Sequence, residues 1–394
     1  MNNLNVIEDN SIINVSFNQD SSCFSIGTQI GFKIYQTFPF KEPYERKMLG
    51  GIGTVEMLYK SNFLALLGGG NAPKFNNNKV VIWDESQKKV ISELKFITPV
   101  INIKLKKDLL FVICHIRIYI FNFNTYDIID TIDTGDNRKG LIAVNNDPEF
   151  TVMAYPSIKN LNSITIKNLK QKKNFTFAVQ EDNINFMSIN YDGKLIATAS
   201  EKGTIIRIHS TIDGTLLKEF KRGYEKVEYI YICFDNDNKF MAVSSNKGTI
   251  HIFSLKSIFK KLKEIENMKK EKDKNNDKNK NKEKIEKNEE KEGCEFEEVE
   301  DFVKVKVDNK TNNNIINESN KNIEEKENEL PDNSKSFFGS EKDFARFRIK
   351  PQKNVCTFVR KNLLIVVSFD NKYYQAEIDM VKGGNCKLLV EKTI

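Results

Sequence analysis

Short β-rich segments recur along this chain at a nearly constant spacing, and this recurrence limits the available folds more than any other feature. Each segment is a run of four or five residues dominated by Ile, Val, Tyr and Phe. Seven such segments are found, at residues 31–35, 79–83, 116–120, 163–166, 203–207, 248–252 and 371–374. The first six are separated by roughly 35 to 50 residues, the period of four-stranded propeller blades. The spacing therefore predicts an all-β, seven-bladed β-propeller.

The seventh segment comes about two periods too late, which indicates a long insertion. Between residues 259 and 340, Lys, Glu, Asn and Asp alternate and apolar residues almost vanish, so we expect this stretch to be disordered. Because Phe344-Ala-Arg-Phe-Arg-Ile349 resumes as an alternating strand, the insertion should interrupt blade six between its third and fourth strands. The predicted organisation is residues 1–258 for blades one to six in part, 259–340 for the insertion, and 341–394 for the end of blade six and blade seven.

An open ring would leave unpaired strand edges at its seam. We therefore expect an N-terminal strand to pair with the last blade and close the ring.

Several classes of protein are excluded by composition. The longest apolar run, residues 109–121, contains His115 and Arg117 and falls short of the ~20 residues that span a bilayer. Six widely separated cysteines indicate neither a zinc site nor a disulfide scaffold, and fit a reducing cytosol. The N-terminal residues show no secretory signal. Because there are three histidines, no nucleophile elbow and no metal-spaced cluster, we predict no enzyme, no metal and no cofactor.

Two adjacent cations, Lys221 and Arg222, lie between near-copies of one strand motif, residues 200–207 and 245–251. In an extended segment successive side chains leave on opposite faces, so each repeat could receive one cation. Hydroxyl groups beside a cation form a phosphate pocket, which indicates two anion sites side by side. The alternative is a solvated basic turn, with serines and threonines that satisfy backbone groups.

The residues described so far resemble one known family, the PROPPIN or WIPI proteins. The resemblance covers nearly all of the predicted propeller. It is carried by Phe17-Asn-Gln-Asp20, Val55-Glu-Met-Leu58, Leu64-Ala-Leu-Leu-Gly-Gly-Gly70, Pro73-Lys-Phe75, Lys79-Val-Val-Ile-Trp-Asp84, Lys139-Gly-Leu141, Ala197-Thr-Ala-Ser-Glu-Lys-Gly-Thr204, Phe220-Lys-Arg-Gly223 and Ser244-Ser-Asn-Lys-Gly-Thr-Ile-His-Ile-Phe253. It implies a seven-bladed propeller that binds polyphosphoinositides and acts in autophagy. The segments 17–20 and 64–70 are most similar to the subgroup that recruits autophagy lipid-transfer proteins.

The resemblance implies two phosphoinositide pockets. The first would contain Ser200, Thr204, Arg207 and Lys221, and the second Ser245, Thr249, His251 and Arg222. The family has Arg where this chain has Lys221, and His where it has Gln180. Since lysine lacks the planar fork that grips phosphate and glutamine carries no charge, we expect the second pocket to dominate.

Two further sites are predicted on weaker patterns. Asn18 and Asp20 match family positions that contact the lipid-transfer partner, although Asn and Asp also favour turns for their own hydrogen bonds. Residues 257–268 place Ile258, Phe259 and Leu262 on one apolar stripe beside lysines, which suggests a short interfacial helix that inserts into a membrane. A helix packed on the propeller, or a disordered segment, would give the same pattern.

We therefore expect a cytoplasmic, monomeric, non-enzymatic effector that binds phosphatidylinositol 3-phosphate, and also the 3,5-bisphosphate, on the autophagosome precursor, endosome or vacuole. It would scaffold autophagy lipid-transfer or conjugation proteins there. The alternative is a protein-only propeller scaffold in membrane trafficking. The formal charge of +7 also fits nucleic acid, but no aromatic and basic platform supports that function, so no nucleic-acid partner is predicted.

Overall fold

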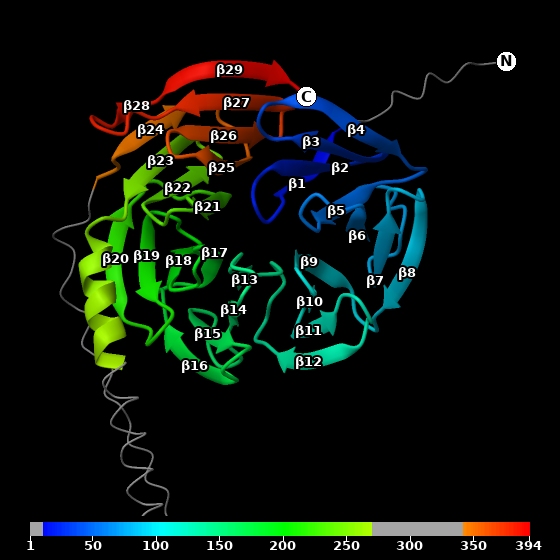
Figure 1. Cartoon of the computed structure of the whole chain (residues 1–394), viewed down its shortest axis with the longest axis horizontal. Helices are drawn as coiled ribbons and strands as arrows, with labels where there is room; N and C mark the ends of the chain where they lie inside the picture. The colour runs from blue at the N-terminus through cyan, green and yellow to red at the C-terminus, as the bar shows by residue number, and fades with distance from the viewer. Residues whose placement is uncertain (1–10, 270–341) are drawn as a thin grey trace, which may run out of the picture. The chain divides into compact units, whose positions relative to one another are not determined.

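Seven β-sheets are arranged around a common axis in the computed structural model, which describes residues 11–269 and 342–394 (Figure 1). The first strand of each sheet lies nearest the axis and the last lies at the rim. The prediction of a seven-bladed propeller is confirmed.

The first four blades are continuous in sequence. Blade 1 contains β1 (Ile12–Phe17), β2 (Cys23–Thr28), β3 (Gly31–Gln36) and β4 (Lys41–Lys47). Blade 2 contains β5 (Ile52–Met57), β6 (Phe63–Gly68), β7 (Lys79–Asp84) and β8 (Lys89–Lys95). Blade 3 contains β9 (Val100–Lys106), β10 (Leu109–Cys114), β11 (Arg117–Asn122) and β12 (Ile128–Asp133). Blade 4 contains β13 (Ala143–Val144), β14 (Val152–Pro156), β15 (Ser163–Asn168) and β16 (Lys173–Ala178).

The remaining three blades include the interruption. Blade 5 contains β17 (Ile184–Ile189), β18 (Leu195–Ser200), β19 (Ile205–Ser210) and β20 (Leu216–Lys221). Blade 6 contains β21 (Ile230–Phe234), β22 (Phe240–Ser245), β23 (Thr249–Ser254), β24 (Ala345–Arg348) and the short β28 (Gly384–Asn385). Blade 7 contains β25 (Asn354–Arg360), β26 (Leu363–Ser368), β27 (Lys372–Glu377) and β29 (Lys387–Thr393). Since β24 pairs directly with β23, the prediction of an insertion in blade six is confirmed.

A helix follows blade 6's third strand, and its described residues are 258–269. The compact unit that contains the propeller comprises Met1–Glu266 and Ser340–Ile394, and Asn267–Gly339 form a second unit. The first turns of the helix, predicted as insertion, therefore belong to the propeller unit. Within the described ranges, no helix has the length and apolar character that a bilayer crossing needs.

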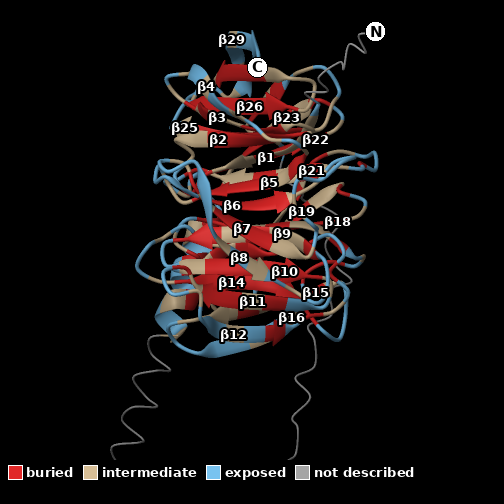
Figure 2. Ribbon diagram, turned by 90° about the vertical axis from the view of Figure 1, so that its right-hand side faces the viewer, coloured by how far each residue is buried: buried red, intermediate tan, exposed pale blue. Residues whose placement is uncertain are grey.

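Side chains from neighbouring blades interdigitate and form the core. Burial follows the inner strands, whereas outer strands such as β12 are largely exposed (Figure 2). Seven apolar clusters are found among the described residues, and each spans two adjacent blades. The core is thus a ring of seven wedges rather than one central mass.

The prediction that an N-terminal strand pairs with the last blade is wrong for the described residues. β1 pairs with β2 inside blade 1, and the C-terminal strand β29 completes blade 7. Side-chain contacts close the seam instead: the Tyr373 hydroxyl donates to the Thr37 carbonyl over 2.7 Å, and Ser21 and Thr357 share a hydrogen bond of 2.7 Å. Because β29 supplies the fourth strand of blade 7, the blade needs no strand from the N-terminal part of the chain.

Candidate functional site

Two equivalent turns, one in blade 5 and one in blade 6, place the predicted site residues at the same end of neighbouring blades. Ser200 ends β18 and Ser245 ends β22. In each turn a glycine amide donates back to the serine carbonyl, over 2.9 Å from Gly203 and 3.1 Å from Gly248. Both glycines have a positive φ, of 61° and 80°, which an L side chain adopts only with strain. The repeated Lys-Gly-Thr sequence is therefore the sequence of a turn as well as of a site.

Lys221 and Arg222 leave the end of β20 in different environments, as the alternation of an extended segment predicts. Arg222 is buried, with 6% of its surface exposed. Its Nε donates to the Gly203 carbonyl over 2.7 Å, and a terminal nitrogen donates to the Glu225 carbonyl. Lys221 is half-buried, and its Nζ lies 3.5 Å from the centre of the Tyr224 ring. Arg222 is thus fixed by the backbone, whereas Lys221 rests against an aromatic face.

The second predicted pocket brings together charges from three segments. His251 of β23 is 2.9 Å from Asp343 through its Nδ1, and Asp343 also accepts from Arg346 over 2.7 Å. Burial lowers the pKa of His251, Asp343 opposes this effect, and the positive charges of Arg222 and Arg346 add to it. The charge of Arg222 therefore acts on His251, although the two side chains share no hydrogen bond among the described residues.

Sequence analysis missed Asp343 and Arg346. A signal was present, because the alternation in residues 344–349 places two arginines on one face of the strand that resumes blade six. In the sheet, Arg346 lies opposite His251 and Arg348 lies opposite Thr249. The second pocket is thus bordered by more cations than its predicted members supply.

The first predicted pocket differs because its arginine is already engaged by protein groups. Arg207 donates to Glu219 and to Glu181, each over 2.6 Å, and to the Gln180 side chain over 3.2 Å. Burial lowers the pKa of Arg207, but the two carboxylates outweigh it and the net shift is upward. Gln180 is buried and its amide donates to the carbonyl and hydroxyl of Thr198, both over 2.9 Å. A phosphate entering here would compete with two carboxylates.

The hydroxyl groups of both pockets are placed similarly. Ser200 and Ser245 are buried, and Thr204 and Thr249 are half-buried. Beside each turn a lysine pairs with a carboxylate: Lys202 with Asp182 over 2.9 Å, and Lys247 with Glu225 over 2.7 Å.

The two residues of the predicted partner site differ in exposure. Asn18 is buried, and its side chain bonds Ser22, Cys23 and the Tyr59 carbonyl within and beside the β1–β2 turn. Asp20 is exposed and accepts from the amide and hydroxyl of Ser22. Asp20 therefore presents a carboxylate at the surface, whereas Asn18 holds the turn.

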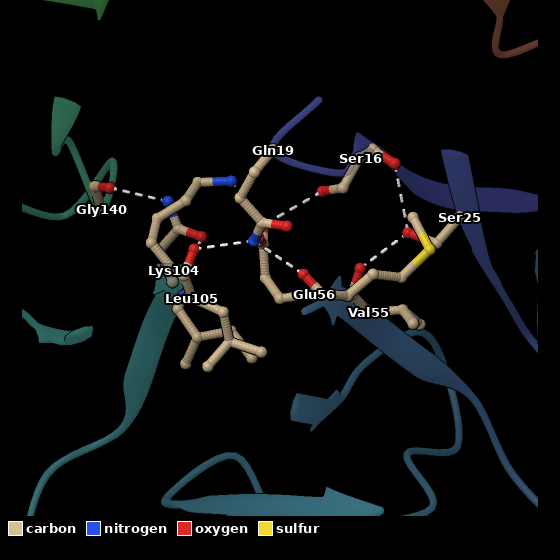
Figure 3. A network of polar contacts seen from close by, with 11 residues as sticks. Ser16, Gln19, Ser25, Val55, Glu56, Lys104, Leu105 and Gly140 are labelled. Atoms are coloured by element: carbon tan, nitrogen blue, oxygen red, sulfur yellow. Dashed lines mark hydrogen bonds and ion pairs between the residues drawn. The ribbon is translucent and has the colours of Figure 1, made fainter. Parts of the chain in front are cut away.

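Gln19, between them, was missed by sequence analysis. Its amide donates to the carbonyls of Met57 and Leu105, each over 2.8 Å, and its oxygen accepts from the Tyr59 amide. It thereby joins blades 1, 2 and 3 (Figure 3).

The apolar stripe of the helix faces the propeller. Ile258 and Leu262 are buried in the cluster between blades 5 and 6, and Phe259 packs partly against it. Lys194 of blade 5 forms an ion pair with Glu266 of the helix over 2.6 Å. In this conformation Ile258 and Leu262 are covered by protein, so the membrane insertion predicted for these residues requires correction: of the alternatives, the structure shows the packed helix.

A polar cavity of about 730 Å³ lies at the axis, lined by the innermost strands. The carboxylate of Glu56 is buried there and accepts from Lys104 and Ser16 (Figure 3). Burial raises the pKa of Glu56, and Lys104 opposes the shift. Among residues 11–269 and 342–394, no group of three or more His, Cys, Asp or Glu is arranged to hold a metal ion.

Comparison with known proteins gives consistent results. The PROPPIN family model matches residues 11–269. SVP1-like protein 2 of Debaryomyces hansenii is 31% identical over 299 residues, which cover 65% of this chain and 69% of the relative. Autophagy-related protein 18e of Arabidopsis thaliana is 35% identical over 255 residues, covering 63% and 67%.

Solved structures share the fold. Kluyveromyces lactis Hsv2 is 21% identical and superposes with a TM-score of 0.65, covering 98% of this chain and 99% of that one. A complex of KlAtg21 with the coiled coil of AgAtg16 has a TM-score of 0.67 at 21% identity, with the same coverage.

Proposed function

The chain belongs to the PROPPIN family, and from this premise we propose that it is a non-enzymatic peripheral membrane effector that binds phosphatidylinositol 3-phosphate. The 3,5-bisphosphate is the second ligand of the same pockets. The observation that supports this proposal best is the set of basic side chains near the twin turns: Arg222 is bonded to the turn of blade 5, and Arg346 lies opposite His251 in blade 6. Buried or half-buried cations beside hydroxyl groups favour a phosphate monoester over a diffuse anionic surface.

The ligand is proposed to bind unequally. In the second pocket Arg222, Arg346 and Lys247 outnumber the carboxylates of Asp343 and Glu225. In the first, Glu219 and Glu181 compensate Arg207, so Lys221 is left as the cation for a phosphate. The second pocket therefore dominates, and the first adds avidity on a membrane that holds many headgroups.

We propose autophagy lipid-transfer or conjugation proteins as the partners of the membrane-bound propeller. The exposed carboxylate of Asp20 supports a contact through the β1–β2 turn. Recruitment would place the protein on membranes rich in phosphatidylinositol 3-phosphate, such as the autophagosome precursor, the endosome or the vacuole.

Flotation with vesicles tests the proposal. Matched vesicles would carry phosphatidylinositol 3-phosphate, its 3,5-bisphosphate, the 4-phosphate, or phosphatidylserine at the same surface charge. We expect flotation with the first two and little with phosphatidylserine alone. A folded protein that floats with none of them would support the protein-only scaffold in membrane trafficking. Equal flotation on all of them would show binding to charge rather than to a headgroup.

A further inference from the structure

An exposed aromatic side chain lies beside the basic site. Tyr224 belongs to the connection between blades 5 and 6, and 88% of its surface is exposed. Gly223, before it, has open space where a side chain would be. A single exposed aromatic side chain is common on a protein surface, so its position beside the basic site is what distinguishes Tyr224. Tyr224 is also the residue whose ring lies against Lys221.

The ring of Tyr224 and the phosphate of a ligand would compete for one cation. Lys221 Nζ lies 3.5 Å from the ring centre, well within the range of a cation–π interaction. The compensated charge of Arg207 leaves Lys221 as the first pocket's main cation. A headgroup in this pocket must therefore draw Lys221 away from the ring.

We propose that Tyr224 is a membrane-contact residue that covers Lys221 in solution and enters the headgroup layer of the bilayer when Lys221 binds a lipid phosphate. The inference rests on the proposed function and adds a contact to it. Tyrosine has an apolar ring and a polar tip, and such side chains gather at the membrane interface. Lys221 and Arg222 precede Tyr224 in the chain and would hold the connection between blades 5 and 6 near an anionic membrane surface. The displaced ring would then enter a less polar environment than water.

Tyr224→Ala should change the affinity for a soluble headgroup and the affinity for a bilayer in opposite directions. Without a bilayer, the ring only competes for Lys221. Tyr224→Ala should therefore tighten binding of glycerophosphoinositol 3-phosphate in the first pocket by about 2- to 5-fold. With a bilayer, loss of the interfacial ring should weaken binding to phosphatidylinositol 3-phosphate vesicles by about 5-fold. Calorimetry measures the first value and vesicle titration the second.

Tyr191→Ala is the matched control, because Tyr191 is an exposed tyrosine in the β17–β18 turn of blade 5; it should change neither value. Tyr224→Trp adds a direct probe, since the chain's one tryptophan is Trp83 on blade 2. Its fluorescence should shift to the blue with phosphoinositide vesicles and not with the soluble headgroup.

Three other results would each contradict part of the proposal. Weaker binding of both ligands by Tyr224→Ala would make Tyr224 a headgroup contact and not a cover. Unchanged vesicle binding, or no shift in Tyr224→Trp, would exclude the membrane contact. If the wild-type protein binds neither soluble headgroup nor vesicle, the proposed function itself fails, and the inference fails with it.

Discussion

The Nε of Arg222 donates a hydrogen bond to the carbonyl of Gly203 over 2.7 Å, and so ties the residue after β20 to the β18–β19 turn. A second donor reaches the carbonyl of Glu225. The guanidinium therefore has a structural role in addition to the one proposed for the ligand, since it holds the connection between blades 5 and 6 against blade 5.

Arg222→Ala should consequently lower the stability of the fold as well as abolish the second pocket. Two carbonyls would lose a buried donor, which costs about 1.5–3 kcal/mol in the free energy of unfolding. Urea unfolding of the wild type, Arg222→Ala and Lys221→Ala measures this cost. Lys221→Ala is the control and should change stability by less than about 1 kcal/mol, because its contact is a partly exposed cation–π pair. Equal stability of all three proteins would contradict the structural role.

The unequal strength of the pockets can be tested without disturbing Arg222. Thr204 and Thr249 occupy equivalent positions after the two glycine turns, and both are half-buried. Valine has nearly the same shape and lacks the hydroxyl, so Thr249→Val and Thr204→Val form a matched pair. We expect Thr249→Val to weaken vesicle binding about 5-fold and Thr204→Val about 2-fold or less.

Lys221→Arg tests the first pocket in the other direction, because it should raise the affinity for vesicles. The planar fork of arginine grips phosphate at two points, so this variant should bind sparse phosphatidylinositol 3-phosphate vesicles more tightly, by about 2- to 5-fold. If Thr204→Val binds more weakly than Thr249→Val, the first pocket carries the binding. If Lys221→Arg brings no gain, the lysine does not limit the first pocket.

Sequence analysis found the architecture because each blade repeats the same β-rich strand. It failed at the seam, because the choice between β29 and the N-terminal strand depends on tertiary pairing. Lys221 and Arg222 do differ in burial and contacts, as alternation along a strand suggests, but the pocket that each serves stays a prediction. The engagement of Arg207 by Glu219 and Glu181 could not be derived, because Glu181 lies on the connection before β17 and approaches only in the folded blade.

The role of the helix at residues 258–269 also depends on contacts that form only in the folded protein. An apolar stripe at residues 258–265 predicts burial of one face, but the stripe alone does not distinguish a bilayer from a protein surface. The distinction comes from blade 5, whose Leu217 and Lys194 contribute an apolar contact and an ion pair to the helix.

Leu262→Ala should therefore destabilise the propeller rather than impair membrane binding. Leu262 is 5% exposed within the cluster between blades 5 and 6, and truncation of a buried leucine costs about 2–5 kcal/mol. Thermal unfolding measures this loss, and vesicle flotation well below the melting temperature should remain at the wild-type level. Lys263→Ala, on the exposed side of the same turn, controls for changes in the helix. A stable Leu262→Ala protein that no longer floats would restore membrane insertion as the role of this stripe.

Deletion of residues 270–335, with a short Gly-Ser linker in their place, should preserve the fold. β24 forms a four-residue antiparallel ladder with β23, and the closure entropy of a flexible loop grows slowly with its length. We expect a single cooperative transition within a few degrees of the wild-type melting temperature, measured by circular dichroism. A broad or biphasic transition would show that the deleted segment contributes to the propeller.

Acid should destabilise the propeller through His209, a buried side chain of β19. Burial lowers the pKa of His209 to about 3, and the charge of Arg207 adds to the effect. The unfolded chain takes up a proton near the usual pKa of about 6.5 while the folded protein does not, so stability is full above about pH 6.5 and falls as the pH approaches 3. The loss is about 1.4 kcal/mol for each pH unit.

Groups whose pKa is raised in the folded protein, such as Glu56, change the stability with pH in the opposite direction. A comparison of the wild type with a variant that lacks the histidine therefore isolates the contribution of His209. In His209→Phe the new ring would pack near Phe177, whose ring centre lies 5.5 Å from that of His209. Urea unfolding at about pH 7.5 and pH 5 should show a pH-dependent loss smaller by about 2 kcal/mol in His209→Phe than in the wild type. Parallel losses in the two proteins would show that His209 titrates alike in the folded and unfolded states.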